Sequence, residues 1–246
     1  MKFGRNARLL IYPQEALTGY WYVGHPDFAE MTFLERFLKP GDIFYDAGAN
    51  AGALSIFAAD LGCHVVAFEP IPKTFSRLQE NVHLNAPNLS IEPLNLALGS
   101  NEEKLVMTTE FGSGNHVLEP GDGSPSVEVP ATTLDKVIKT RPSPNFLKVD
   151  VEGHELEVIK GAASLLKSSE LLGLMMETFR PHNWRLKRLQ ELEALLGEHG
   201  FTPFDFDPVE NKITPLKMPF DGHNNTFYFR NLGQVAERLN MSSPAE

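Results

Sequence analysis

Apolar runs and amphipathic stretches alternate along most of this chain. The runs at 43–47, 64–70 and 145–151 are mostly apolar at successive positions, which is typical of strands buried between two layers of helices. Apolar residues at helical spacing follow these runs. The pattern predicts helices at residues 27–38, 53–62, 72–84, 154–168 and 186–200, and further strands at 89–98, 171–179, 201–206 and 225–231.

This alternation predicts an α/β fold with a mostly parallel sheet covered by helices on both faces. The last two runs have no helix between them, so we expect a hairpin there and one antiparallel strand. Residues 104–131 have the pattern of two strands joined by a loop rich in Gly, Ser and Pro, and Pro93 predicts a bulge or break. We expect an N-terminal segment with its helix (1–40), a main domain (41–233) and a frayed tail (234–246).

The acidic balance of the chain argues against general binding of nucleic acid. Its 246 residues include 32 Asp and Glu against 22 Lys and Arg, a net charge of −10, whereas nucleic-acid surfaces require clustered cations. No run is long and apolar enough for a membrane span, and the start has no apolar leader. The one cysteine, Cys63, is typical of a reducing compartment. We therefore expect a cytoplasmic protein that binds neither nucleic acid nor membrane.

The turn after the first buried strand is rich in glycine but departs from the dinucleotide fingerprint. That fingerprint, GxGxxG, presents backbone amides to a pyrophosphate. Here Asn50 replaces the middle glycine, between Gly48 and Gly52, and either braces the turn or contacts the cofactor. Asp46 lies near the end of the strand, where a buried carboxylate would repel a pyrophosphate. We expect instead a cationic nucleoside without phosphate, S-adenosylmethionine, whose carboxylate the turn amides would accept.

A second carboxylate, Glu69, follows the next strand about 20 residues after Gly48. Carboxylates at this spacing accept hydrogen bonds from ribose hydroxyls in nucleoside-binding folds. Pro70 fixes the turn that follows. Taken singly, Asp46 would be a helix cap and Glu69 an exposed loop acid. At the ends of adjacent buried strands, the two together indicate a nucleoside site.

These positions belong to four blocks of the chain: GDIFYDAGANAGALSIFAA, VVAFEP, NLALGS and FLKVDVEGHELEVIKGA. In order and spacing, and in the asparagine of the glycine turn, they resemble the FkbM-type S-adenosylmethionine-dependent methyltransferases from about Glu30 to Glu177. The resemblance implies a class I methyltransferase fold over 41–233. This is a Rossmann-like three-layer sandwich whose mostly parallel seven-stranded sheet has one antiparallel strand near the C-terminus. It also implies cofactor contacts by Asp46, Gly48, Ala49, Asn50, Gly52, Glu69, Pro70, Ala97 and Leu98, the last two beside adenine.

The segment DVEGHE places more acids after a buried strand. Asp150 and Glu152 would point to the same side of that strand and face the cleft, and His154 is a candidate base because an ordinary histidine titrates near neutrality. Glu177, at the end of an apolar strand, faces either the cleft or an ion pair with Arg180. We expect Asp150 or His154 to be the base, with Glu152 and Glu177 shaping the acceptor pocket. Asp150 and Glu152 lack an evident third ligand for a divalent cation, so we expect no metal.

The resemblance implies methyl transfer to a hydroxyl of a sugar or small secondary metabolite, with a small molecule or glycan as acceptor. Three alternatives stay open: transfer to nitrogen or carboxylate, a nicotinamide-dependent oxidoreductase, and a cofactor-binding module without turnover. We expect acceptor choice in the N-terminal segment and in the loops 110–126 and 179–185. The first of these loops either folds over the cofactor or is a surface connection. The aromatic cluster Tyr20, Trp21 and Tyr22 either lines an acceptor pocket or packs the N-terminal segment onto the sheet. The sequence predicts no oligomeric state.

Overall fold

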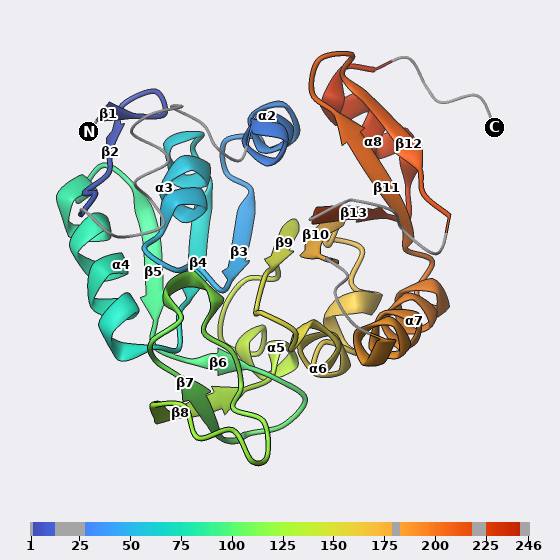
Figure 1. The fold of residues 1–246 in the computed structure, drawn as a ribbon. Helices are drawn as coiled ribbons and strands as arrows, with labels where there is room; N and C mark the ends of the chain where they lie inside the picture. Colours follow the sequence, from blue (N-terminus) through green and yellow to red (C-terminus); the bar gives the residue numbers. More distant parts are fainter. Residues whose placement is uncertain (1, 13–27, 179–182, 218–224, 242–246) are drawn as a thin grey trace.

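The computed structural model describes residues 2–12, 28–178, 183–217 and 225–241. At its centre is an eight-stranded sheet in the order β12-β11-β13-β10-β9-β3-β4-β5 (Figure 1). Its strands are β3 (Ile43–Ala47), β4 (His64–Phe68), β5 (Ser90–Leu94), β9 (Phe146–Val149), β10 (Gly173–Glu177), β11 (Thr202–Asp207), β12 (Lys212–Pro215) and β13 (Asn225–Phe229).

The direction of the strands confirms the predicted fold class. Strands β5, β4, β3, β9 and β10 are parallel neighbours. Strand β13 lies between β10 and β11 and is antiparallel to both, as predicted for one strand near the C-terminus. An eighth strand, β12, pairs antiparallel with β11 at the edge of the sheet. The sequence did not reveal β12, because only one of its four residues, Ile213, is buried.

Helices cover both faces of this sheet, which gives the predicted three layers. Alternate strand residues enter opposite layers, so that Phe44 packs with one set of helices and Tyr45 with the other. The first set is α2 (Phe28–Phe37), α3 (Ala53–Asp60), α4 (Pro72–Asn85) and α8 (Leu232–Leu239), and the second is α5 (Leu134–Val137), α6 (Glu155–Lys160) and α7 (Asn183–Glu198). Among the described residues, no helix has the length and apolar character needed to cross a bilayer.

A second, three-stranded sheet lies at the carboxyl ends of β3 and β4 (Figure 1). It consists of β6 (Ala97–Leu98), β8 (Ser126–Thr132) and β7 (Glu103–Thr108) in that order. The predicted single strand at 89–98 is therefore divided between two sheets. The chain does not break at Pro93, which lies within β5; β5 is an edge strand, where a residue without an N–H is tolerated.

The remaining elements are short. A two-stranded sheet joins β1 (Lys2–Phe3) to β2 (Ala7–Arg8), and two 3-10 turns occur, η1 (Gly112–Gly114) and η2 (Leu165–Lys167). The helix predicted at 154–168 ends early, at Lys160, and continues only as η2. Gly161 follows Lys160 directly. A Cβ at Gly161 would lie 2.1 Å from the Gly99 carbonyl oxygen, so two segments of backbone approach closely there.

The predicted frayed tail is wrong for the residues up to Leu239. They form α8, which the side chain of Asn231 caps by accepting from the Gln234 amide, and which buries Val235, Ala236 and Leu239. Our sequence reading missed α8 because eight residues carry too short an apolar repeat. Residues 242–246 lie outside the described part of the chain.

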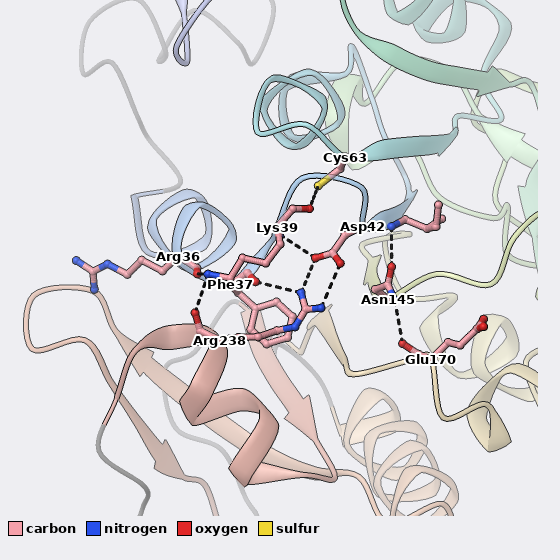
Figure 2. A network of polar contacts seen from close by, with 9 residues as sticks. Arg36, Phe37, Lys39, Asp42, Cys63, Asn145, Glu170 and Arg238 are labelled. Carbon is pink, nitrogen blue, oxygen red and sulfur yellow. Dashed lines mark hydrogen bonds and ion pairs between the residues drawn. The ribbon is translucent and has the colours of Figure 1, made fainter.

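One ion pair fastens α8 to the amino-terminal end of β3 (Figure 2). Both terminal nitrogens of Arg238 donate to the carboxylate of Asp42, and one also donates to the Phe37 carbonyl at 3.3 Å. Lys39 donates to the Arg238 carbonyl at 3.1 Å. The thiol of Cys63 lies in the same network, and burial raises its pKa to about 12, so it is not a reactive thiolate.

Candidate active site

A pocket of about 310 Å³ opens at the carboxyl ends of β3, β4 and β9, bounded by the loop that leads to β6 and by the second sheet. Ligands of open α/β sheets bind at this edge. Eleven of the thirteen predicted site residues line it: Asp46, Gly48, Ala49, Asn50, Glu69, Pro70, Ala97, Leu98, Asp150, Glu152 and His154. The other two, Gly52 and Glu177, are not part of its wall.

Left-handed backbone conformations shape the glycine turn. Gly48, Asn50 and Gly52 have φ of 79°, 51° and 91°. A Cβ on Gly48 would lie 1.8 Å from the carbonyl oxygen of Asp150, so only glycine allows the two loops to approach this closely. Gly52 contributes to packing and does not line the pocket. It is the N-cap residue of α3, and a Cβ there would lie 2.5 Å from a methyl group of Leu78.

The amides of this turn donate hydrogen bonds within the protein. We had expected them to donate to the carboxylate of the cofactor instead. The Gly48 and Ala49 amides donate to the Phe68 carbonyl at 3.0 and 2.9 Å, and the Gly52 amide donates to the Ala49 carbonyl. The Ala51 amide donates to the side chain of Asn50 at 2.8 Å. Asn50 therefore braces the turn, the first of its two predicted roles, while it also lines the pocket.

Glu69 closes the same turn from the end of β4. Its carboxylate accepts from the amides of Asn50 at 3.0 Å and Ile71 at 2.9 Å. Burial raises the pKa of Glu69 to about 7, against the opposite effect of these two hydrogen bonds. Asn95 holds the adjacent backbone by donating to the carbonyls of Glu69 and Pro70, each at 2.8 Å. Glu69 thus faces the pocket from a rigid position.

Asp46 already has partners in the protein. Ser55 donates to its Oδ2 at 2.6 Å, and the ammonium group of Lys148 lies 3.2 Å from its Oδ1. We expected Asp46 to suit a cationic ligand; in the structure Lys148 is a cation of the protein that already lies beside it. Our sequence reading did not single out Lys148. Its signal was a lone lysine inside an apolar strand, two positions before Asp150.

The acidic segment forms a turn, as predicted for residues 152–154. The turn already begins at Asp150, so the alternation of a strand, from which we expected Asp150 and Glu152 to point to the same side, does not apply. Strand β9 ends at Val149, and Glu152 and Gly153 have φ of 54° and 95°. Glu155 stabilises the turn by accepting from the amides of Val151 at 3.3 Å and Gly153 at 2.9 Å. A left-handed glutamate is a strained conformation of the kind that clusters at functional sites.

His154 stands at the start of α6 and lines the pocket. Burial lowers the pKa of His154; Arg188 also lowers it, while Glu157 and Glu103 act in the opposite direction. The imidazole is therefore neutral at pH 7. A neutral imidazole can accept a proton, which is what a base at this position requires.

Glu177 meets the acidic turn from β10. One carboxylate oxygen each of Asp150, Glu152 and Glu177 lies within 4.8 Å of the others. The structure thus supplies the third carboxylate that the sequence pattern lacked, and the set is chemically able to hold a hard divalent cation. The alternative that Glu177 pairs with Arg180 falls on a residue outside the described ranges. The expected absence of a metal stays a prediction.

The loop at 110–126 reaches the pocket, since Gly112, Ser113 and Asn115 line it. The Asn115 side chain holds the loop by accepting from the Phe111 amide at 3.0 Å and donating to the Gly112 carbonyl at 2.8 Å. The expected aromatic wall of Tyr20, Trp21 and Tyr22 lies outside the described residues, as does the start of the loop at 179–185.

Residues 46–203 match the family model described as the methyltransferase FkbM domain. The match covers every sequence block that forms the pocket except the residues just before Asp46. The chain belongs to the FkbM methyltransferase family. The resemblance inferred from the sequence is thereby confirmed, and the class I fold agrees with the observed strand order.

This FkbM methyltransferase is similar to two characterised relatives. The hexuronic acid methyltransferase AglP of Haloferax volcanii is 36% identical over 131 residues, which are 52% of each chain, so the protein spans about half the length of that relative. The methyltransferase SdnD of Sordaria araneosa is 30% identical over 201 residues, 67% of this chain and 75% of that one.

Among solved structures, the magnesium protoporphyrin IX methyltransferase of Synechocystis, with bound S-adenosylmethionine, superposes with a TM-score of 0.49 at 11% identity. The superposition covers 90% of this chain and 87% of that one.

Proposed function

We propose that this FkbM methyltransferase transfers the methyl group of S-adenosylmethionine to a hydroxyl of a sugar or small secondary metabolite. The observation that carries the proposal is the single pocket in which a nucleoside-type carboxylate, Glu69, and a neutral histidine, His154, both take part. One end offers a place for the donor, and the other offers a base for the acceptor. The hexuronic acid named for AglP supports a sugar as acceptor.

The pocket fits the proposed donor. Gly48, Ala49 and Asn50 form one wall of it. Glu69 presents acceptor oxygens for ribose hydroxyls. Ala97 and Leu98 would lie beside adenine, with Pro70 at the turn between ribose and base. When bound, S-adenosylmethionine supplies an activated methyl carbon whose sulfonium departs as a neutral thioether.

The protein's own contribution is to orient the acceptor and remove its proton. The acceptor oxygen would take the methyl group, and sulfur would keep the electron pair of the broken carbon–sulfur bond. The hydroxyl proton passes to His154. We assign the base to His154 rather than Asp150 because the carboxylate of Asp150 is engaged by Lys148 at 3.3 Å. Glu152, which lines the pocket, would accept hydrogen bonds from other hydroxyls of the acceptor, and Glu177 would shape the site from beside Asp150 and Glu152.

The remaining properties of the proposal follow the sequence. A buried free cysteine, Cys63, is compatible with a reducing cytoplasm. The acidic net charge of −10 favours a small molecule or glycan over nucleic acid.

Two measurements test the function. Isothermal calorimetry with S-adenosylhomocysteine and with NAD(H) is expected to detect binding of the first only, and binding of NAD(H) alone would overturn the proposal. Incubation with methyl-labelled S-adenosylmethionine and a panel of sugars, amines and carboxylic acids should label hydroxyl oxygens. Label on nitrogen or carboxylate would establish the alternative specificity, and tight binding without transfer to any acceptor would favour a non-catalytic module.

A variant pair then identifies the base. His154→Gln should lower turnover by about 10²–10⁴-fold while leaving S-adenosylhomocysteine affinity within about threefold of wild type. The control is His83→Gln, an exposed histidine on α4. Equal turnover in the two variants would exclude His154 as the base.

A further inference from the structure

Lys148 is a buried cation at the floor of the pocket, and only 7% of its side chain is exposed. It lies on β9 opposite Asp46 of the neighbouring strand β3. Residues 146 and 148 point to one face of β9 because successive side chains of a strand alternate. Phe146 packs into the apolar layer on that face, whereas Lys148, nearer the carboxyl end, meets polar groups.

The ammonium group of Lys148 has three N–H donors, and the structure offers it three acceptors. They are the carbonyl oxygen of Gly48 at 2.8 Å, Oδ1 of Asp46 at 3.2 Å and Oδ2 of Asp150 at 3.3 Å. Burial alone would lower the pKa of Lys148, but the carboxylates of Asp150 and Asp46 outweigh it and the net pKa is raised. Lys148 is therefore charged; it donates a hydrogen bond to the Gly48 carbonyl and forms ion pairs with the carboxylates of Asp46 and Asp150.

These acceptors come from two different turns. Gly48 belongs to the glycine turn after β3, and Asp150 begins the acidic turn after β9. The backbones touch as well: the Asp150 amide donates to the Ala47 carbonyl at 3.1 Å, and Gly48 leaves no space for a Cβ beside Asp150. Few side chains could replace this contact, because it needs a long stem that ends in several donors.

We propose that Lys148 is a positioning residue that holds the donor turn (residues 48–52) and the acceptor turn (residues 150–154) as one rigid unit. This inference rests on the proposed function, in which the first turn lies beside S-adenosylmethionine and the second carries the base. Methyl transfer requires the reacting atoms to be aligned, and a displacement of about 1 Å costs about 100-fold in rate. Lys148 acts on that alignment through the two turns, from its place at the floor of the pocket.

The charge of Lys148 has a second effect. Lys148, Asp46 and Asp150 together carry one negative charge, and without Lys148 they would carry two. S-adenosylmethionine has one more positive charge than S-adenosylhomocysteine, so Lys148→Met should shift the affinity ratio toward S-adenosylmethionine by about three- to tenfold. A lysine that only filled space would leave this ratio unchanged.

Hydrogen exchange of the ligand-free protein measures whether Lys148 holds the two turns together. In Lys148→Met we expect the amides of 48–52 and of 150–154 to exchange at least about tenfold faster together, while the amides of β4 and β10 stay protected. Lys148→Arg, which keeps the charge, should restore the affinity ratio and part of the protection. Lys104→Met, at a side chain 72% exposed on β7, is the matched control and should change neither.

Several outcomes would overturn the inference: faster exchange in one turn only, in neither, or in the whole sheet equally. If Lys148→Met does not fold, the double variant Lys148→Met/Asp46→Asn removes the unpaired buried carboxylate. In this double variant the amides of the sheet should again be protected from exchange, while the amides of both turns should still exchange fast. Full protection of both turns would refute the proposal that Lys148 holds them together. Failure of wild type to bind S-adenosylhomocysteine would reject the proposed function instead, since the exchange comparison uses no ligand.

Discussion

Replacing Gly48 by alanine tests the contact between the two turns of the site. At the φ of 79° found here, a non-glycine residue is strained by about 1–2 kcal/mol. The added Cβ would also lie 1.8 Å from the Asp150 carbonyl oxygen, a backbone atom that cannot rotate away. Forced repacking of this kind costs about 1–3 kcal/mol. We therefore expect Gly48→Ala to lower the free energy of unfolding by about 2–5 kcal/mol.

Urea denaturation followed by circular dichroism measures this loss, and Gly200→Ala isolates its cause. Gly200 has the same φ of 79°, but the nearest atom to its Cβ would be Arg230 Cβ at an ordinary 3.8 Å. The control should lose only the strain of about 1–2 kcal/mol. In calorimetry, Gly48→Ala should weaken S-adenosylhomocysteine binding at least tenfold, and Gly200→Ala should not change it. Equal losses of stability in the two variants would refute the close approach.

Three further predictions concern titration and the C-terminal helix. Because the pKa of Glu69 rises from 4.5 to about 7 on folding, the free energy of unfolding of wild type should fall relative to that of Glu69→Gln as pH rises through that interval. The same pH dependence of the two proteins in urea denaturation would contradict this. Arg238→Ala removes the cation that pairs with the buried carboxylate of Asp42, and it should lower the free energy of unfolding in urea by about 1–3 kcal/mol. The affinity for S-adenosylhomocysteine should be unchanged, because this ion pair lies at the end of β3 opposite the pocket. Burial lowers the pKa of His154, so the acidic limb of kcat/KM against pH should lie at lower pH than an ordinary histidine would give, and it should vanish in His154→Gln.

Much of the fold could be predicted because its signals are local. Buried parallel strands need apolar residues at successive positions, and their helices need an apolar stripe, so each element is visible within a window of about ten residues. Elements with few buried side chains, such as β12 and α8, were not predicted from the sequence. The pairing of β6 with β8 also escaped, because it joins Ala97 to Ala131, and nothing near Ala97 records that partner.

The pocket residues could be predicted for a related reason. In a parallel sheet all carboxyl ends meet at one edge, so Asp46, Glu69 and Asp150 had to lie near one another once their strands were known. The bonding within the turns could not be predicted. We expected the amides of the glycine turn to be available, yet Glu69 and the Phe68 carbonyl take several of them.

The sequence by itself determined the layered α/β architecture and the edge of the sheet where the pocket opens, since these depend on periodicity and on residues at strand ends. Its four motif blocks carried the resemblance to the family. Only the tertiary structure decided which charges meet. Lys148 neutralises Asp46 because β9 pairs with β3 in a register that places them opposite each other. Glu177 joins Asp150 because β10 lies beside β9. Such contacts depend on the register between strands far apart in the chain, and no local pattern carries that information.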